Sequence, residues 1–259
     1  MPFSALLRLL LALLLALAPA AAAAFERVGV VLLHGKTGSP AQFTVLAADL
    51  EDMGFAVEAP EMCWSGRRIY DRSITACLED VDAAVDRLRA DGITRIVVAG
   101  HSLGGVGALL YGATHDGLAG IIALAPAGDP PAAAKGATLA KSLAAARAAA
   151  KAGNGDTVAT YADVVLGRAL PVTATAADFL SFFGPDSPGA MARTLPALRA
   201  PLLWVAGSRD GSQKNAGDRF RTAPAHPENR FVTVKADHLG TPSAAFGPMV
   251  DWLQALETE

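Results

Sequence analysis

The sequence predicts an α/β fold, in which a mostly parallel sheet of six strands is flanked by helices and carries an inserted helical cap. Short apolar runs rich in valine, isoleucine and leucine are typical of strands that are covered on both faces. These runs alternate with helical stretches, which indicates right-handed crossovers and a parallel sheet. One segment, residues 127–200, separates two expected strands by more than a crossover needs, so we expect it to form the cap.

The composition is that of a folded protein with a sizeable core. The chain has 259 residues, and 52% of them are hydrophobic. The formal net charge is −3 and the basic residues form no stripe, so we expect no nucleic-acid partner. Two cysteines are too few for a disulfide scaffold or a four-cysteine zinc site, and we expect no metal.

Residues 1–24 have the pattern of a cleaved signal peptide. Arg8 supplies a positive charge, residues 9–18 form an unbroken apolar run, and the alanines of 20–24 offer several Ala-x-Ala cleavage sites. The run is too short for a typical spanning helix, although an uncleaved membrane anchor stays open as the alternative. We therefore expect a mature chain of residues 25–259 in the periplasm or the medium.

The expected elements follow one another in a regular order. Helical spacing is clear before the third strand, where Val81, Val85 and Leu88 lie on one stripe. An alanine-rich helix is expected over 132–152 in the cap, and a last helix over 248–256. The six expected strands cover residues 28–35, 55–62, 95–102, 120–126, 201–207 and 230–238.

The strongest chemical signal is a G-x-S-x-G pentapeptide at residues 100–104, which contains Ser102. It lies between the third expected strand and a helix expected over 106–111. A sharp strand-to-helix turn of this kind raises a serine hydroxyl above the sheet and needs small neighbours. We interpret Ser102 as a catalytic nucleophile; the alternative is a glycine-rich structural turn.

A serine hydroxyl needs a base, and His238 is the best candidate among five histidines. It directly follows the last strand, which places it at the same edge of the sheet as Ser102. The alternative is a structural loop histidine. The other histidines are His34, His101, His115 and His226.

The base in turn needs an acid to orient it, and Asp210 lies just past the penultimate strand. The chain order Ser102, Asp210, His238 is the one expected after such a turn. The other acids near a strand end or near the histidine are Asp129, Asp218 and Asp237.

Two backbone N–H groups should stabilise the negative oxygen that forms during acyl transfer. One is expected from Leu103, directly after the nucleophile, and the other from the loop after the first strand. In that loop we choose Lys36, with Thr37 second. The Gly-Lys-Thr of this loop is no phosphate-binding motif, because Val30 stands where that motif requires a glycine.

Taken together, HGKTG, GHSLGG, WVAGSRD and the late His238 resemble the α/β-hydrolase superfamily from residue 28 to the last helix, apart from the cap. The resemblance implies a serine hydrolase domain over residues 25–259 with a cap at about 127–200. It implies a Ser102–His238–Asp210 triad and no cofactor. Members often begin with two antiparallel strands, for which the expected mature chain has no room before residue 28.

We expect a secreted hydrolase that cleaves carboxylic esters through an acyl-enzyme at Ser102. A thioesterase, an amidase or peptidase, and an acyltransferase stay open on the same triad, as does a non-catalytic binding protein. The substrate is expected to be a small, apolar ester. The pattern gives no oligomeric state. Residues proposed for the substrate pocket, with core packing as the alternative, are Trp64, Phe179, Phe182 and Phe183.

Two further features concern the surroundings of the protein. The charged residues between 130 and 155, up to Lys151, are all basic, so this part of the cap could contact an anionic membrane, although a solvated face is favoured. Cys63 and Cys77 are the only cysteines, and in an oxidising compartment we expect them to form a disulfide, with two buried thiols as the alternative.

Overall fold

The computed structural model describes residues 27–127, 129, 136–165 and 167–257; the expected signal peptide lies outside them. Six strands form one sheet in the order β2-β1-β3-β4-β7-β8, and every neighbouring pair is parallel. The predicted parallel sheet of six strands is therefore confirmed. The strands are β1 (Val28–Leu33), β2 (Ala56–Glu58), β3 (Arg95–His101), β4 (Gly120–Leu124), β7 (Leu202–Gly207) and β8 (Arg230–Val234).

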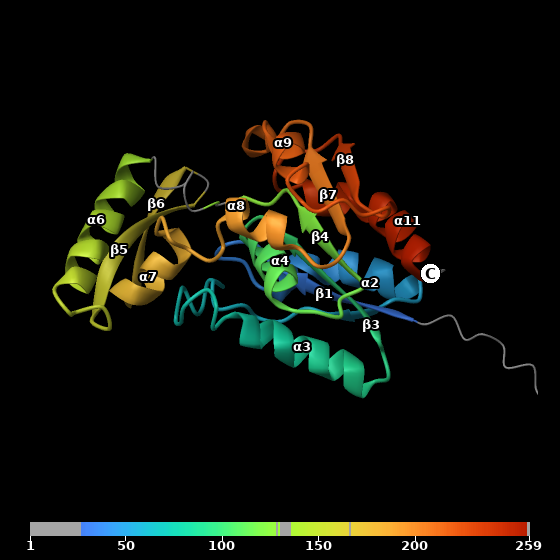
Figure 1. The fold of residues 1–259 in the computed structure, drawn as a ribbon, viewed down its shortest axis with the longest axis horizontal. Coiled ribbons are helices and arrows are strands. Elements are labelled where there is room, and N and C mark those ends of the chain that lie inside the picture. The colour runs from blue at the N-terminus through green and yellow to red at the C-terminus, as the bar shows by residue number, and fades with distance from the viewer. Residues whose placement is uncertain (1–26, 128, 130–135, 166, 258–259) are drawn as a thin grey trace, which may run out of the picture.

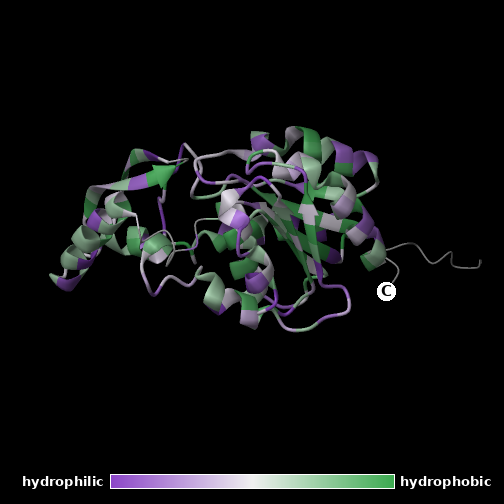
Figure 2. Ribbon diagram, turned by 90° about the horizontal axis from the view of Figure 1, so that it is seen from above, coloured by the Kyte–Doolittle hydropathy of each residue, from purple (hydrophilic) through white to green (hydrophobic). Residues whose placement is uncertain are grey.

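Helices cover both faces of the sheet (Figure 1). On one face, Val81 of α3 and Leu109 of α4 belong to one buried cluster; on the other, Leu50 of α2 and Trp252 of α11 belong to a second. Strands β1, β4 and β7 are buried along their whole length, and Figure 2 shows the hydrophobic character of the central strands. The four helices are α2 (Thr44–Asp52), α3 (Leu78–Ala90), α4 (Leu103–Thr114) and α11 (Phe246–Glu257).

Six short helical segments occur besides these four helices in the part of the chain that the structure describes. They are η1 (Pro40–Phe43), α8 (Met191–Thr194), η2 (Leu195–Ala197), η3 (Gly211–Gln213), α9 (Ala216–Phe220) and α10 (Thr241–Ala244). Two of them, α8 and η2, lie in the segment between β4 and β7. No helix within the described residues is both long and apolar enough to cross a membrane. Strand β2 is shorter than predicted and ends before Pro60, which has no N–H to continue the ladder.

The segment between β4 and β7 forms the cap, which lies beside the sheet in Figure 1. It contains the expected alanine-rich helix, here α6 (Ala137–Lys151), and a second helix, α7 (Ala176–Phe183); residues 132–135 of the expected helix lie outside the described residues. It also contains a hairpin that we did not predict, in which β5 (Val158–Val165) pairs antiparallel with β6 (Arg168–Thr175). Alternate residues of the hairpin face inward, Tyr161 and Asp163 on β5 and Val172 and Ala174 on β6, and this alternation is the strand pattern that sequence analysis overlooked.

Aromatic side chains join the cap to the body. Phe182 and Phe183 of α7 are buried against Tyr70, with ring centroids 4.6 Å and 5.3 Å from its ring. Trp64 lies 6.4 Å from Phe182 in an edge-on arrangement. Tyr70 and Trp64 belong to the loop between β2 and α3, so the cap packs against this loop.

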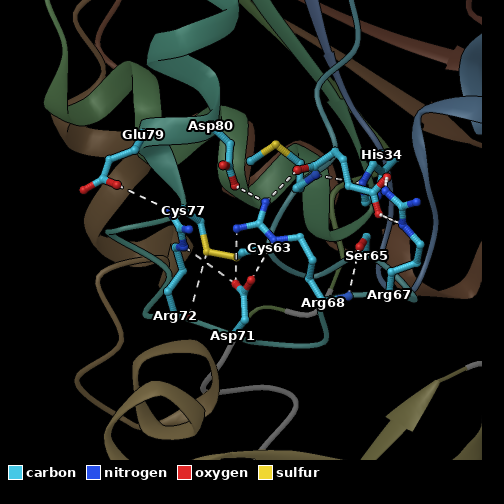
Figure 3. A network of polar contacts seen from close by, with 12 residues as sticks. His34, Cys63, Ser65, Arg67, Arg68, Asp71, Arg72, Cys77, Glu79 and Asp80 are labelled. Carbon is cyan, nitrogen blue, oxygen red and sulfur yellow. Dashed lines mark hydrogen bonds and ion pairs between the residues drawn. A yellow bond between two sulfur atoms is a disulfide. The ribbon is translucent and has the colours of Figure 1, made fainter.

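A disulfide between Cys63 and Cys77 closes this loop, as predicted, with the two Cα atoms 5.6 Å apart. Arg68 fastens it further, because its guanidinium donates hydrogen bonds to the carboxylates of Asp71 and Asp80 and to the carbonyl of Glu61 (Figure 3). Asp80 lies in the first turn of α3. The loop is thus attached covalently and by charge to the body of the protein.

Replacing both cysteines by alanine should lower the free energy of unfolding by about 3 kcal/mol, because the unfolded chain loses a cross-link that closes a loop of this length. Urea denaturation of the oxidised protein and the double variant measures the difference. Reductant should lower the free energy of unfolding of the wild type by a similar amount and leave that of the variant unchanged. Equal stability of all four samples would show that the disulfide does not stabilise the fold.

Candidate active site

Ser102 lies between the end of β3 and the first residue of α4, with φ 57° and ψ −118°. This positive φ is rare for a residue with a side chain and costs conformational energy. The turn is possible because Gly100 and Gly104 pack so closely: a Cβ on Gly100 would lie 2.1 Å from the Gly104 carbonyl oxygen, and one on Gly104 would lie 2.0 Å from the Leu33 carbonyl oxygen. The backbone contacts therefore require glycine at both positions.

The structure brings the three predicted residues Ser102, His238 and Asp210 together. The Ser102 hydroxyl donates to His238 Nε2 over 2.9 Å, and His238 Nδ1–H donates to Asp210 Oδ2 over 2.6 Å. An ionised carboxylate only accepts hydrogen bonds, so it holds the proton of His238 on Nδ1 and leaves Nε2 free to accept. Ser102 also stands at the N-terminus of α4, whose dipole favours negative charge.

Asp210 is set up to remain ionised. Burial raises the pKa of its carboxyl group, but hydrogen bonds from His238 and from Ser212 outweigh this and leave the pKa below its ordinary value. The backbone N–H of Ser212 donates to Asp210 Oδ1 over 2.9 Å, so both oxygens have donors. A fixed negative charge at this position stabilises an imidazolium on His238.

The other acids are engaged elsewhere. Asp129 accepts from the backbone N–H of Met191, and Asp237 accepts from that of Gly240. Asp218 pairs with Arg221 three residues along α9. Geometry thus selects Asp210 as the partner of His238.

Hydrogen-bond accounting in the loop after β1 distinguishes between Lys36 and Thr37. The N–H of Thr37 donates to the Trp64 carbonyl (2.9 Å) and that of Gly38 to the Gly35 carbonyl (3.0 Å). The N–H of Gly35 donates to Gln42 Oε1 (2.9 Å). Among the backbone N–H groups of residues 35–38, all of which the structure describes, that of Lys36 alone has no acceptor, so it is available to a ligand.

A second hydrogen-bond chain, which sequence analysis missed, runs from this loop to His238. Gln42 of η1 accepts from Gly35 and donates through Nε2 to His101 Nδ1 over 2.7 Å. His101 Nε2–H donates to the His238 carbonyl over 2.9 Å. A carbonyl can only accept, so the proton of His101 is on Nε2 and every donor and acceptor in the chain has its direction assigned. A single glutamine in a loop gives no sequence signal for such a role.

His101 is a neutral imidazole in this chain. Burial, and then the charge of nearby His238, lower the pKa of His101 to about 4. Its ring centroid lies 4.8 Å from that of His238. His101 therefore stays uncharged at neutral pH and supports the backbone of His238 without competing for its proton.

A cavity of about 430 Å³ opens over these residues. Its polar side includes Ser102, His238 and Asp210. Its apolar side is formed by Ala127 and by residues of the cap and of the loop after β8, namely Val164, Val165 and Leu239. The cap thus contributes one wall of the cavity.

The aromatic residues that we proposed for the pocket lie elsewhere. Trp64, Phe179, Phe182 and Phe183 are almost completely buried, and none of them lines the cavity. Trp64 donates through Nε1 to the His34 carbonyl, and the phenylalanines pack between cap and body. These four side chains therefore belong to the core, which was the alternative to a role in the pocket.

Groups of three or more metal-ligating side chains do not occur in the described part of the chain.

The sequence matches the family described as serine aminopeptidase, S33, over residues 26–167, which is more than half of the chain. The chain belongs to this family of α/β-hydrolases. The superfamily inferred from the motifs is therefore confirmed, and the protein is a hydrolase. A comparison with curated protein sequences gave no match.

Solved structures of lipolytic enzymes and of a thioesterase share the fold. A monoacylglycerol lipase from Paleococcus ferrophilus is 20% identical, with a TM-score of 0.67, over 89% of this chain and 95% of that one. A structure from the metagenome-derived lipolytic enzymes LipS and LipT is 19% identical, with a TM-score of 0.64, over 90% and 94%. The thioesterase domain of the curacin biosynthetic pathway is 14% identical, with a TM-score of 0.57, over 90% and 92%. At these identities the likeness is one of fold.

Because burial lowers the pKa of His101, we expect its imidazole to stay neutral, with the proton on Nε2, down to about pH 4. Nitrogen-detected NMR of the histidine side chains measures the pKa of His101 and shows which ring nitrogen carries the proton. A His101→Gln variant assigns the signal. Gln42→Met should raise the pKa, since it removes the donor that stabilises the neutral form. Titration of wild-type His101 near 6.5, or a proton on Nδ1, would contradict the hydrogen-bond chain.

Proposed function

We propose that this protein is a secreted serine hydrolase that cleaves carboxylic esters through an acyl-enzyme. The observation that carries the proposal is the hydrogen-bond chain from Ser102 through His238 to Asp210, at the floor of a cavity. A hydroxyl becomes a nucleophile when an adjacent base can take its proton, and the base is effective when an acid fixes its tautomer. Both conditions are met by neighbouring side chains.

In the first half of the reaction, Ser102 Oγ attacks the acyl carbon while His238 Nε2 takes its proton. Asp210 stabilises the imidazolium that results. The backbone N–H groups of Leu103 and Lys36 donate to the oxygen that becomes negative. The imidazolium then gives its proton to the leaving alcohol, and the acyl group stays on Ser102.

In the second half, water attacks the acyl-enzyme. His238 takes a proton from the water, and the tetrahedral intermediate again places its negative oxygen between the two N–H groups. Collapse of the intermediate releases the acid and returns the proton to Ser102. No cofactor enters either half.

The lining of the cavity favours an apolar ester over a peptide. Val164, Val165 and Leu239 offer no hydrogen-bonding side chain to a substrate. Removal of an N-terminal residue from a peptide would require a partner for its ammonium group. Among the described residues that line the cavity, Asp210 is the only carboxylate, and it is occupied by His238 and Ser212.

Export is proposed on two supports. The first 24 residues have the sequence of a signal peptide, and the disulfide of the loop between β2 and α3 is of a kind that persists in oxidising compartments. We therefore propose a location in the periplasm or the medium.

Ser102→Ala should reduce hydrolysis of a p-nitrophenyl ester by at least about a thousandfold, because no other side chain supplies the nucleophile. Asp210→Asn should lose as much or less. The assay follows release of p-nitrophenol. Thioester and anilide substrates with the same acyl group should be cleaved more slowly by the wild type.

The matched control is Ser243→Ala, an exposed serine of α10 outside the cavity, which should retain full activity. Thermal unfolding of each variant shows whether it is folded. An active, folded Ser102→Ala variant would overturn the proposed mechanism, and faster cleavage of the thioester or anilide would overturn the ester assignment.

A further inference from the structure

We propose that Asp163 of the cap is a positioning residue, which holds Lys36 so that the backbone N–H of Lys36 faces the reacting carbonyl group. The proposal rests on the proposed function. It implies that catalysis depends on the contact between the cap and the loop after β1. Asp163 is on β5, far from the triad in sequence, and nothing in the motifs points to it.

Asp163 is a buried carboxylate with a complete set of donors. Its side chain is 1% exposed, and its Oδ1 accepts from Lys36 Nζ (2.9 Å) and from the backbone N–H of Val164 (2.6 Å). Its Oδ2 accepts from the Tyr70 hydroxyl (2.6 Å). A buried charge is tolerated only when it is paired and hydrogen-bonded, so each of these donors is needed.

Lys36 is held equally firmly. Its side chain is 14% exposed, and Nζ donates to the Val164 carbonyl (3.3 Å) as well as to Asp163. The ammonium group also lies 4.7 Å from the ring centroid of Phe183, a favourable position for a cation. The three partners of this ammonium group all belong to the cap, namely Asp163, Val164 and Phe183.

Three segments that are distant in sequence meet at this carboxylate: the loop after β1, the disulfide-closed loop and the cap hairpin. Two of them hold a residue with a side chain at positive φ, Thr37 at 56° and Tyr70 at 58°. Such backbone persists only where the surroundings fix it. The N–H of Thr37 also donates to the carbonyl of Trp64, which links the first two segments directly.

The same contact sets the wall of the cavity. Val164 and Val165 follow Asp163 on β5 and line the cavity together with Lys36. The ion pair between Asp163 and Lys36 therefore holds this wall in place, and it holds the one unpaired N–H of the described residues 35–38 in the cavity that Ser102 also lines. Loss of this ion pair would free the Lys36 side chain, so that neither the cavity wall nor the Lys36 N–H would be held in position.

Lys36 also lines the cavity, so a direct role of its ammonium group in binding an anionic substrate has to be considered. The ammonium group is already neutralised by Asp163 and bound by the Val164 carbonyl. The charge of Lys36 is therefore already balanced and hydrogen-bonded within the protein, which favours the positioning role.

Asp163→Asn and Lys36→Met each break the ion pair, and Lys36→Met keeps the backbone N–H. Either variant should lower kcat for a neutral p-nitrophenyl ester by about 10- to 100-fold, with a smaller change in KM, because a misplaced donor weakens binding of the transition state more than of the substrate. The controls Asp156→Asn and Lys151→Met change exposed residues of the cap and should leave kcat unchanged.

The double variant Lys36→Met/Asp163→Leu removes both charges and leaves neither unpaired. Its kcat should be no lower than that of the worse single variant, because both substitutions break one contact. A kcat far below that of Lys36→Met would overturn the coupling, and this comparison can be made even if Asp163→Asn fails to fold.

A wild-type kcat in folded Asp163→Asn would overturn the proposal while leaving the proposed function intact, provided that Ser102→Ala is inactive. An increase in KM confined to anionic esters in Lys36→Met would overturn it in favour of direct binding by the ammonium group. Activity in Ser102→Ala would instead overturn the function itself.

Discussion

The left-handed backbone of Ser102 is the constraint from which the rest of the site follows. It requires the chain to reverse within one residue between β3 and α4, which is possible because Gly100 and Gly104 let strand, helix and the neighbouring β1 approach at backbone contact. The parallel sheet then brings the ends of β7 and β8 to the same edge, where His238 contacts Ser102 and Asp210 contacts His238. Strain at one residue is thus supported by the packing of the whole sheet.

Two polar networks extend this constraint outward. On one side, Gln42 and His101 link the loop after β1 to the backbone of His238. On the other, Asp163 links the same loop to the cap and to Tyr70 of the disulfide-closed loop. Both networks end on the loop that contains Lys36, which makes this loop the junction between the triad, the cap and the disulfide.

Local patterns predicted the sheet, the turn at Ser102 and the disulfide, because each follows from a short run of sequence. Strand order predicted that His238 and Asp210 lie near Ser102. The hairpin β5–β6 was not predicted, because its inward-facing positions include Asp163 and Ala174, which weaken the apolar alternation. Those phenylalanines lie in the core, because apolar character alone does not distinguish a cavity wall from packing. Gln42 and Asp163 act through contacts across 59 and 127 residues of sequence, which no local pattern reveals.

If Ser102, in its strained turn, is an activated nucleophile, a fluorophosphonate should label it covalently. Mass spectrometry of the intact protein and of its proteolytic peptides measures how many labels are bound and where. We expect one label per chain, on Ser102, formed faster than in an Asp210→Asn variant. A protein that stays unlabelled, or a label on another residue, would contradict this expectation.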